Sequence, residues 1–408
     1  MNIIEIINKK RLKMELTKEE LDYAFTNYMS GAIKDYQMSS LLMAICINGM
    51  TLEEIFILTD LFLHSGDILD LSSVPGVKVD KHSTGGVGDK TTLVIGPIVA
   101  SCGLFVPKMS GRALGHTGGT IDKLESIEGF NVNLTLNQFI DQVNKIGFAL
   151  TSQTPNLTPM DKKIYALRDV TGTTESIPLI ASSIMSKKIA GGADKILIDI
   201  KVGKGALIKT KEDAIKLSNI MIEIGKKYNK EVRTIMTDMN NPLGTSIGNS
   251  LEVLEAIHIL QGKEEGSFKN LCIELASNMV SMGKNISIEE AKEEVIEVLN
   301  NKDAYRKFIE FVEMQNGDIT KLKFSNNCVD ILSKKDGIIM SIDAQEIGKI
   351  SMDLGAGRKE ITDTIDHKVG IVLRKKVGDK VLKNDILCTI YLGDKPLEKD
   401  VESFFVIE

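Results

Sequence analysis

The sequence predicts an α/β protein in three parts: a discontinuous all-helical domain, a larger α/β domain with a mostly parallel sheet, and a strand-rich α+β subdomain at the carboxyl end. Three observations lead to this prediction. The first 65 residues show the apolar periodicity of helices. Short apolar strands then alternate with helical stretches, which is typical of a parallel sheet built from βα units. After Asn326 the apolar runs are short and strand-like.

The all-helical domain is expected to combine residues 1–66 with residues 162–193. Thr17-Lys-Glu-Glu20 and Thr51-Leu-Glu-Glu54 both have the form of a capping box, in which a Thr and a Glu three residues later satisfy free N–H groups at a helix start. The stretch Ile177–Ile189 has the same helical character as the amino-terminal segment. The chain would therefore leave this domain after the first segment and return to it later.

The α/β domain is expected over residues 67–161 and 194–330, and the strand-rich domain over residues 331–408. Alternating or short apolar runs predict strands, and longer runs with helical spacing predict helices. The expected strands of the α/β domain are Val77–Asp80, Leu104–Val106 and Lys195–Ile200, and its expected helices are Thr91–Ala100, Leu136–Ile146 and Glu212–Lys230, with further helices from about 245 to 315. Strand-like runs at 337–341, 369–373 and 385–391 follow in the last domain.

The segment from Val377 to Asp385 resembles the hairpins of biotinyl and lipoyl carrier domains. Those carriers attach their cofactor to a Lys in a tight turn, typically within Met-Lys-Met. Because the sequence contains no such triplet, it does not predict an acylated carrier arm.

Composition excludes several classes of partner. Lys and Arg number 50 against 56 Asp and Glu, there is no Trp and aromatic residues make up 5%, whereas nucleic-acid binders usually show a basic excess or stacking aromatics. No apolar run approaches the roughly 18 residues that cross a bilayer, and the amino terminus does not have the form of a signal peptide. Five cysteines without CxxC spacing argue against a disulfide framework or a zinc knuckle. We therefore expect a cytoplasmic protein with no nucleic-acid or membrane partner.

The stretch Lys81-His-Ser-Thr-Gly-Gly-Val-Gly-Asp-Lys-Thr-Thr92 lies between an expected strand and an expected helix. Its three glycines allow a tight backbone path, and the amino terminus of a helix offers free N–H groups to an anion. Lys81 adds a cation, and Ser83 and Thr92 add hydroxyl groups. The alternative is an ordinary connection between strand and helix, but the combination of residues favours phosphate binding.

A nucleotide-binding P-loop is not expected, because Asp89 separates Gly88 from Lys90 and breaks the required spacing. A second loop, from Pro107 to Glu125, again follows an expected strand and carries Gly118-Gly119-Thr120 before a possible helix start. Ligands of α/β sheets bind outside the carboxyl ends of the strands. Two such loops can therefore hold one small anion between them.

The motifs KHSTGGVGDKTT and KMSGRALGHTGGTIDKLES closely resemble the thymidine and pyrimidine-nucleoside phosphorylase family. The resemblance continues through residues 165–190, 237–244, 248–253, 354–358 and 369–381, so it spans almost the whole chain. It implies a helical domain that holds a pyrimidine, an α/β domain that holds phosphate, and a homodimer. The first loop is more distantly similar to the anthranilate phosphoribosyltransferases, which share the helical and α/β layout.

The resemblance also implies roles for individual residues. His82 matches the active-site histidine of the family, and Arg168 and Lys187 would act with it as catalytic donors to the departing base. The phosphate site would comprise Lys81, Ser83, Thr92, Lys108, Ser110 and Thr120, and the pyrimidine site Arg168, Ser183, Lys187, His116 and Leu114. No organic cofactor is implied, and inorganic phosphate is the co-substrate.

Some members of the family hold a monovalent cation near the first loop, so potassium is a candidate ligand. The matching positions are Gly88, Lys90, Leu243, Ser246 and Glu255. Backbone carbonyls and a carboxylate suit a hard cation, but Lys90 departs from the family pattern, since relatives can carry a small Thr there. If its ammonium group pointed inward, it would compete with the metal.

The activity that the resemblance implies is the reversible phosphorolysis of pyrimidine nucleosides such as uridine, deoxyuridine and thymidine to the free base and (2-deoxy)ribose 1-phosphate. Phosphate would attack the anomeric carbon from the face opposite the base and invert its configuration. Arg168 and Lys187 would stabilise the negative charge that grows on the base. Three alternatives stay open: a phosphorylase restricted to thymidine, more distantly a phosphoribosyltransferase of the anthranilate type, and a non-enzymatic binding module such as a nucleoside sensor or a carrier protein.

Overall fold

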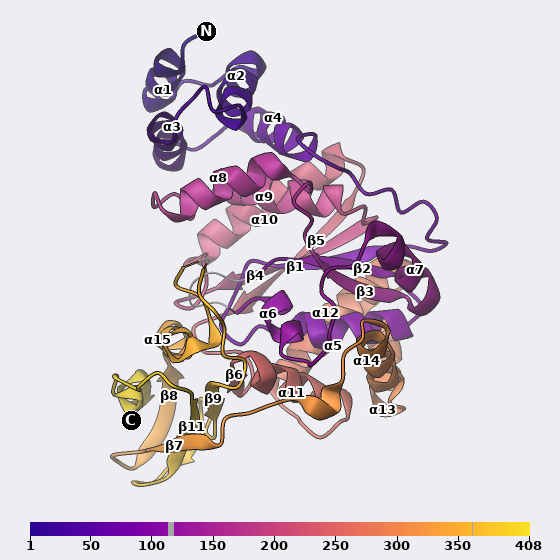
Figure 1. Cartoon of the computed structure of the whole chain (residues 1–408), viewed down its shortest axis with the longest axis vertical. Coiled ribbons are helices and arrows are strands. Elements are labelled where there is room, and N and C mark those ends of the chain that lie inside the picture. The colour runs from indigo at the N-terminus through magenta and orange to yellow at the C-terminus, as the bar shows by residue number, and fades with distance from the viewer. Residues whose placement is uncertain (113–117, 361) are drawn as a thin grey trace. The chain divides into compact units, whose positions relative to one another are not determined.

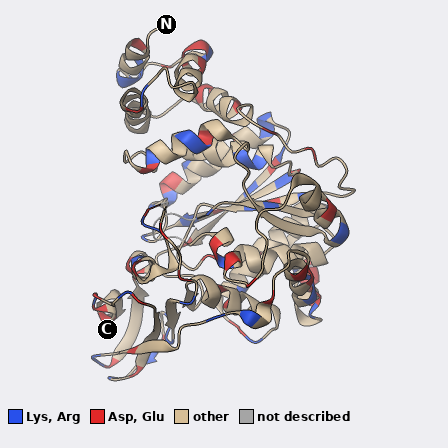
Figure 2. Cartoon of the chain, viewed as in Figure 1, with Lys and Arg blue, Asp and Glu red and all other residues tan. Residues whose placement is uncertain are grey.

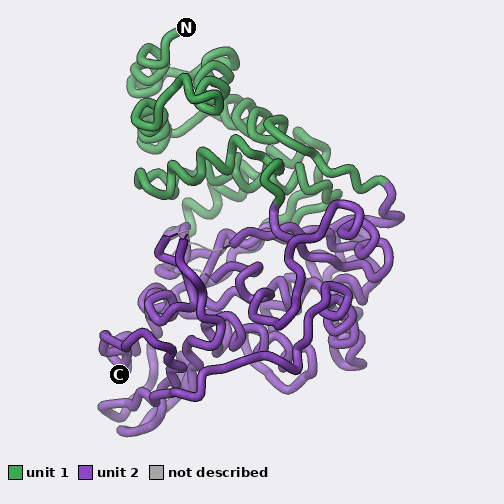
Figure 3. Tube along the Cα trace, in the orientation of Figure 1, with its two compact units in different colours: residues 1–72, 154–196, 210–234 green, residues 73–153, 197–209, 235–408 purple. Residues whose placement is uncertain are grey.

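The structure, a computed structural model, describes residues 1–112, 118–360 and 362–408 (Figure 1). It divides into two compact units, each assembled from segments that are separate in the sequence (Figure 3). The first unit comprises residues 1–72, 154–196 and 210–234, and the second comprises residues 73–153, 197–209 and 235–408. The chain therefore passes between the units several times.

Helices form most of the first unit. Both predicted capping boxes are confirmed, because the Thr17 side chain accepts the N–H of Glu20 and the Thr51 side chain accepts the N–H of Glu54. The helices of this unit are α1 (Ile3–Arg11), α2 (Lys18–Met29), α3 (Asp35–Asn48), α4 (Leu52–Leu63), α8 (Pro159–Asp169), α9 (Ile177–Ala190) and α10 (Lys211–Lys227). The apolar core shared by α1 to α4, α8 and α9 includes an edge-to-face pair of Phe rings on α2 and α4.

Helix α10 belongs to the first unit, whereas the boundaries expected from the sequence assign residues 194–330 to the α/β domain. The reason is its amphipathic face. Leu217, Met221 and Ile224 are buried on α10, and the helix packs against α9. A helix that follows a strand in the sequence is predicted to belong to a βα unit. The element it packs against decides to which unit of the structure it belongs.

A mostly parallel sheet carries the first and second loops. Strands β1 (Val79–Ser83), β4 (Lys195–Val202) and β5 (Glu231–Asp238) lie in the order β1-β4-β5. Strand β2 (Val106–Ser110) pairs in parallel with β3 (Phe148–Ser152). A parallel bridge between Lys78 and Phe105 links these two strands to the three-stranded group. The strand expected at 104–106 thus begins two residues later. Strands β3 and β5 were not predicted, because only one residue separates β3 from α7 and only three separate β5 from α10.

Strongly apolar helices support this sheet. The second unit contains α5 (Thr91–Ser101), α6 (Thr120–Glu125), α7 (Leu136–Ile146), α11 (Asn249–Leu260), α12 (Ser267–Lys284), α13 (Ile288–Asn300) and α14 (Asp303–Met314). Helix α5 is buried along nearly its whole length, and a Cβ at Gly96 would lie 2.5 Å from the Phe148 ring. This close approach of helix and strand requires a residue without a side chain.

The carboxyl end forms two antiparallel sheets, in the orders β6-β9-β11-β7 and β10-β8-β12, with helix α15 (Ala344–Ser351) beside them. The strands are β6 (Ser246–Ile247), β7 (Asn327–Leu332), β8 (Gly337–Ile342), β9 (Gly370–Leu373), β10 (Lys380–Val381), β11 (Ile386–Leu392) and β12 (Phe405–Ile407). Strand β6 comes from a stretch that was expected to be helical. Because β6 pairs with β9, the strand-rich part groups with the α/β part in one unit.

The predicted fold class is confirmed, with amino-terminal helices, a parallel sheet and a strand-rich carboxyl end. Acidic and basic residues are interspersed along the helices in the view of Figure 2. Among the described residues, no helix is both long enough and apolar enough to cross a membrane. All five cysteines are free thiols.

Candidate active site

The first loop connects β1 to α5 along a path that depends on glycine. Gly85 and Gly88 have φ angles of +95° and +75°, a region that side chains with a Cβ rarely adopt. Thr84 fixes the start of the loop to β4, because its N–H donates to the Asp199 carbonyl at 3.1 Å and its hydroxyl accepts the Lys201 N–H at 2.9 Å. The loop is thus held between β4 and the first turn of α5.

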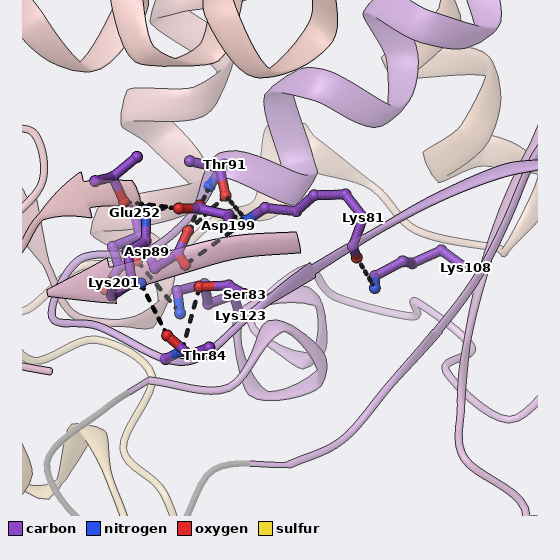
Figure 4. Close-up of polar contacts among 12 residues, drawn as sticks. Lys81, Ser83, Thr84, Asp89, Thr91, Lys108, Lys123, Asp199, Lys201 and Glu252 are labelled. Atoms are coloured by element: carbon purple, nitrogen blue, oxygen red, sulfur yellow. Dashed lines mark hydrogen bonds and ion pairs between the residues drawn. The ribbon is translucent and has the colours of Figure 1, made fainter. Parts of the chain in front are cut away.

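Lys81 lies at the centre of a buried cluster of charges (Figure 4). Its Nζ donates to the Thr91 hydroxyl at 2.6 Å and lies 3.1 Å from Oδ2 of Asp199 and 3.8 Å from Oδ2 of Asp89. Lys201 Nζ lies 2.7 Å from the same oxygen of Asp199. The cluster therefore holds two ammonium groups and two carboxylates.

The electrostatics of this cluster keep Lys81 and Asp89 charged. Burial alone would lower the pKa of Lys81, but the carboxylates of Asp89 and Asp199 raise it above its ordinary value. Burial alone would raise the pKa of Asp89, but the ammonium groups of Lys81 and Lys201 hold it well below its usual range. Lys81 is consequently a fixed ammonium group, oriented before any ligand binds.

Lys108 points to a different place from the cluster. Its Nζ donates to the carbonyl of Lys81 at 2.6 Å and to Oδ1 of Asp80 at 3.2 Å, so it braces β2 against β1 (Figure 4). The phosphate contact expected of Lys108 stays a prediction. In this structure its ammonium group already has two partners on the neighbouring strand.

The hydroxyl groups expected to bind phosphate all lie at strand ends or helix starts. Ser83 ends β1, Ser110 ends β2, Thr92 is the second residue of α5 and Thr120 is the first residue of α6, and all four are half-buried. His82 is also half-buried, in β1. The expected pyrimidine contacts Leu114 and His116 lie outside the described residues.

The second loop brings Gly118 close to a buried ion pair. A Cβ at Gly118 would lie 2.8 Å from Nζ of Lys123, which is buried and 3.3 Å from Oε2 of Glu252 on α11. Glu252 also accepts the N–H of Gly248 at 3.2 Å. This second buried ion pair appears beside the Lys81 cluster in Figure 4.

Arg168, on α8 in the helical unit, is fully buried and bonded to backbone carbonyls. Its guanidinium group donates to the carbonyls of Thr173 at 3.2 Å, Thr174 at 2.9 Å and Leu179 at 3.2 Å. Burial lowers the pKa of Arg168, although Asp161 counteracts this. A guanidinium has five N–H groups, so these three bonds hold the turn before α9 and leave two donors for other partners.

Lys187 and Ser183 come together one turn apart on α9. Lys187 Nζ lies 2.6 Å from Oδ2 of Asp161 and donates to the Ser183 hydroxyl at 3.2 Å. The centroid of the Tyr165 ring lies 5.4 Å from Lys187 Nζ and 5.5 Å from Cζ of Arg168. Arg168 and Lys187 therefore lie near the same aromatic ring, and Ser183 contacts Lys187.

The residues expected to hold potassium also come together, but the arrangement does not fit a bound ion. The ammonium group of Lys90 itself contacts Leu243, Ser246 and Glu255. Within the described parts of the chain, His, Cys, Asp and Glu side chains form no group of three or more that could hold a metal. Three of the positions expected to hold potassium are therefore already contacted by the Lys90 ammonium group.

Sequence reasoning missed five residues of these two clusters. Asp199 and Lys201 lie in the buried strand β4, where two charges in an apolar run are themselves a signal. Asp161 and Tyr165 precede Arg168 by seven and three residues on α8, which is the spacing of one helix face. The fifth residue, Asp89, was considered only as a break in a P-loop pattern.

Sequence profiles of three families match the chain. The helical bundle domain of the glycosyl transferase family matches residues 4–66 and its a/b domain matches residues 76–305. The pyrimidine nucleoside phosphorylase C-terminal domain matches residues 338–404. Together these profiles cover the helical, α/β and strand-rich parts in the order that the fold shows.

Curated relatives match over nearly their whole length. The pyrimidine-nucleoside phosphorylase of Geobacillus stearothermophilus is 51% identical over 398 residues, covering 96% of this chain and 92% of the relative. That of Bacillus subtilis strain 168 is 48% identical over 412 residues, covering 99% and 95%. Among solved structures, the anthranilate phosphoribosyltransferase of Thermus thermophilus has a TM-score of 0.60 at 17% identity, covering 76% of this chain and 99% of that one, which is a likeness of fold. The chain therefore belongs to the pyrimidine-nucleoside phosphorylase family.

Proposed function

We propose that the chain catalyses the reversible phosphorolysis of pyrimidine nucleosides to the free base and a pentose 1-phosphate. One observation carries the proposal in the structure. Lys81, buried at the start of the glycine loop, holds a fixed ammonium group against the Thr91 hydroxyl in the first turn of α5 and the Asp199 carboxylate of β4. The similarity to curated pyrimidine-nucleoside phosphorylases supports it over almost the whole chain.

In the proposed reaction, phosphate binds in the α/β part through Lys81, Ser83, Thr92, Ser110 and Thr120, with Lys108 holding β2 in place. Hydroxyl groups and free N–H groups at the helix starts would donate to its oxygens. A phosphate oxygen then attacks the anomeric carbon opposite the base and inverts its configuration. Since phosphate is the nucleophile, the reaction needs no nucleophilic side chain and no organic cofactor.

The base would be held by the helical unit. Negative charge grows on the pyrimidine as the glycosidic bond breaks, and Lys187 and the two remaining donors of Arg168 would stabilise it. Asp161 would orient the Lys187 ammonium group, and Ser183 would bind the base beside it. His82 would donate to the base or orient the nucleophile, and an imidazole can act as hydrogen-bond donor or acceptor.

The test is an assay of base release from uridine, deoxyuridine, thymidine and cytidine, each with and without inorganic phosphate. We expect uracil and thymine to be released only when phosphate is present. Phosphate-dependent turnover of thymidine and of no other nucleoside would favour a phosphorylase restricted to thymidine. Turnover of phosphoribosyl pyrophosphate with magnesium, and no phosphate-dependent release, would favour the anthranilate type and contradict the proposal.

We further propose that the protein is a cytoplasmic homodimer that pairs through α3. Tyr36, Met43 and Ile47 are spaced along one face of α3 and are 72%, 38% and 74% exposed. Light scattering after size exclusion is expected to give twice 44.8 kDa. Ile47→Asp should shift the protein toward the monomer, while Leu136→Asp, at an exposed apolar position on α7, should not. Equal masses for wild type and Ile47→Asp would refute this interface.

A further inference from the structure

The ammonium group of Lys90 sits inside a shell of oxygen atoms, and the residue is 1% exposed. Its Nζ lies 2.8 Å from the carbonyl oxygen of Leu243, 2.9 Å from that of Ser246 and 2.8 Å from Oε2 of Glu255. The Phe268 ring closes another side, with its centroid 4.8 Å from Nζ. Two carbonyl dipoles, one carboxylate and an aromatic face therefore surround a single cation.

Two glycines allow the backbone to come this close. A Cβ at Gly244 would lie 2.2 Å from Oε1 of Glu255 and 2.8 Å from Nζ of Lys90, and a Cβ at Gly88 would lie 2.5 Å from the Leu243 carbonyl oxygen. Both glycines also have positive φ angles, +70° and +75°. Two separate loops thus shape the shell. A Cβ at Gly88 would clash with the Leu243 backbone, and one at Gly244 would clash with the side-chain ends of Glu255 and Lys90.

The same shell has the chemistry of a site for a monovalent cation. Carbonyl oxygens replace the water around potassium in other proteins, and carboxylates bind hard cations. The distances to Nζ, 2.8 to 2.9 Å, exceed the roughly 2.0–2.6 Å typical of magnesium and calcium. Because Nζ already contacts these oxygens, a potassium ion and the Lys90 side chain cannot both occupy the shell.

We propose that the Lys90 ammonium group is a covalently attached replacement for a bound monovalent cation. The chain then requires no such cation, whereas a variant that lacks this side chain beyond Cβ acquires a site for one. The group joins the first loop to the turn at 243–246 and to α11, whose Glu255 also accepts the N–H groups of Thr245 at 2.8 Å and Ser246 at 2.7 Å.

Lys90 is also a positioning residue, a role that rests on the proposed function. It directly precedes Thr91, whose hydroxyl group accepts from Lys81. Holding Lys90 in the shell therefore holds the start of α5 against the Lys81 cluster. The shell contributes to phosphate binding through this placement and not through contact with phosphate.

A cavity of about 470 Å³ lies next to the shell and gives cations a route to it. Leu243, Gly244, Glu255 and Phe268 belong to both. The remaining lining includes Asp238, Glu264, Glu265 and Glu274 against Lys269 and Lys376, so negative side chains predominate. Once the Lys90 side chain is shortened, cations from solvent can reach the vacated oxygens.

The wild-type protein provides the first test. After dialysis into choline chloride it should retain no potassium by atomic emission, and its melting temperature should be the same in choline, sodium and potassium chloride at equal ionic strength. Its kcat and its KM for phosphate should likewise be unchanged. A potassium requirement in any of these measurements would overturn the inference.

The variant Lys90→Thr provides the second test. In choline chloride its melting temperature should fall by about 10 °C, since an uncompensated buried carboxylate is left behind. Potassium or ammonium chloride at the same ionic strength should restore at least half of that loss and also lower a raised KM for phosphate. Equal melting temperatures in choline and potassium chloride would contradict the proposal.

The matched control is Lys10→Ala in the helical unit. Lys10 is equally buried and pairs with both oxygens of Glu54 at 2.7 and 2.8 Å, but no carbonyl shell surrounds its Nζ in the part of the chain described. This variant should lose stability without any rescue by potassium, and rescue there would overturn the inference. If Lys90→Thr does not fold in any of these salts, the wild-type measurements alone decide whether Lys90 replaces a bound cation. An inactive wild type with the expected salt behaviour would refute the proposed function and leave the role of Lys90 intact.

Discussion

Replacing Lys81 with Met is expected to lower kcat/KM for phosphate by about 10²- to 10³-fold. The substitution removes the ammonium group that we propose for phosphate binding and leaves the hydroxyl groups of Ser83 and Thr92 in place. Steady-state kinetics with phosphate varied at saturating nucleoside measure the effect. The KM for nucleoside should change little, because the base is proposed to bind in the other unit.

The same substitution should destabilise the protein. Asp89 and Asp199 would share one ammonium group, Lys201, in place of two, and removing one partner of a buried pair costs about 3–5 kcal/mol. The double variant Lys81→Met/Asp199→Asn restores the charge balance, and Asn keeps an oxygen for the hydroxyl of Thr237 that bonds Asp199 at 2.7 Å. We expect this double variant to regain much of the free energy of unfolding but none of the phosphate activity.

Lys108→Met is the matched control for the Lys81 prediction. Lys108 is equally buried and also lies on a strand of the sheet, but its Nζ braces β2 against β1. This variant should lose stability with a smaller effect on phosphate use than Lys81→Met. If Lys81→Met keeps wild-type kinetics, or if the double variant recovers activity together with stability, the role assigned to Lys81 is wrong.

Replacing Arg168 with Met is expected to lower nucleoside turnover at least about 10²-fold and to cost at least about 3 kcal/mol of stability. Three buried carbonyls, those of Thr173, Thr174 and Leu179, would lose their donor. The turn before α9 would loosen, and Ser183 and Lys187 on that helix would lose their positions. Chemical denaturation and kinetics with nucleoside varied measure the two effects.

Arg168→Lys separates charge from geometry. A lysine keeps the positive charge but lacks the planar fork, so it cannot reach three carbonyls of one turn at once. We expect it to recover only a small part of either loss. Arg306→Met is the control, because Arg306 is exposed on α14 and its partners among the described residues, Asp303 and the Asn301 carbonyl, are both local. It should change stability by under about 0.5 kcal/mol. Wild-type kinetics in Arg168→Met would refute the assignment.

Much of the fold could be predicted because its signals are local. The capping boxes at Thr17 and Thr51 depend on residues three positions apart, and α2 and α4 begin where those boxes predict. Strands β3 and β5 were missed because only a short turn, at Gly147 and at residues 228–230, separates each from the preceding helix, and the helical pattern was read through it. The packing of α10 against α9 could not be predicted from the α10 sequence, because an amphipathic pattern does not indicate which element the apolar face packs against.

Some residues of the candidate site could likewise be predicted from the sequence, and others could not. The glycines and hydroxyl groups of the first loop are adjacent in sequence, so their grouping was visible at once. The partners of Arg168 could not be predicted, because every residue has a backbone carbonyl and the sequence does not indicate which carbonyls accept from Arg168. Asp161 and Tyr165 were within reach, since they share a helix face with Arg168.

By itself the sequence determined the family, the order of the helical, α/β and strand-rich parts, and the two glycine loops, because each depends on residues that are neighbours along the chain. Only the tertiary structure decided what the buried lysines do. Lys90 meets carbonyls 153 and 156 residues away, and Lys81 meets Asp199 on another strand. The charge of an ammonium group is fixed by its chemistry, but its role depends on which oxygens folding brings within about 3 Å.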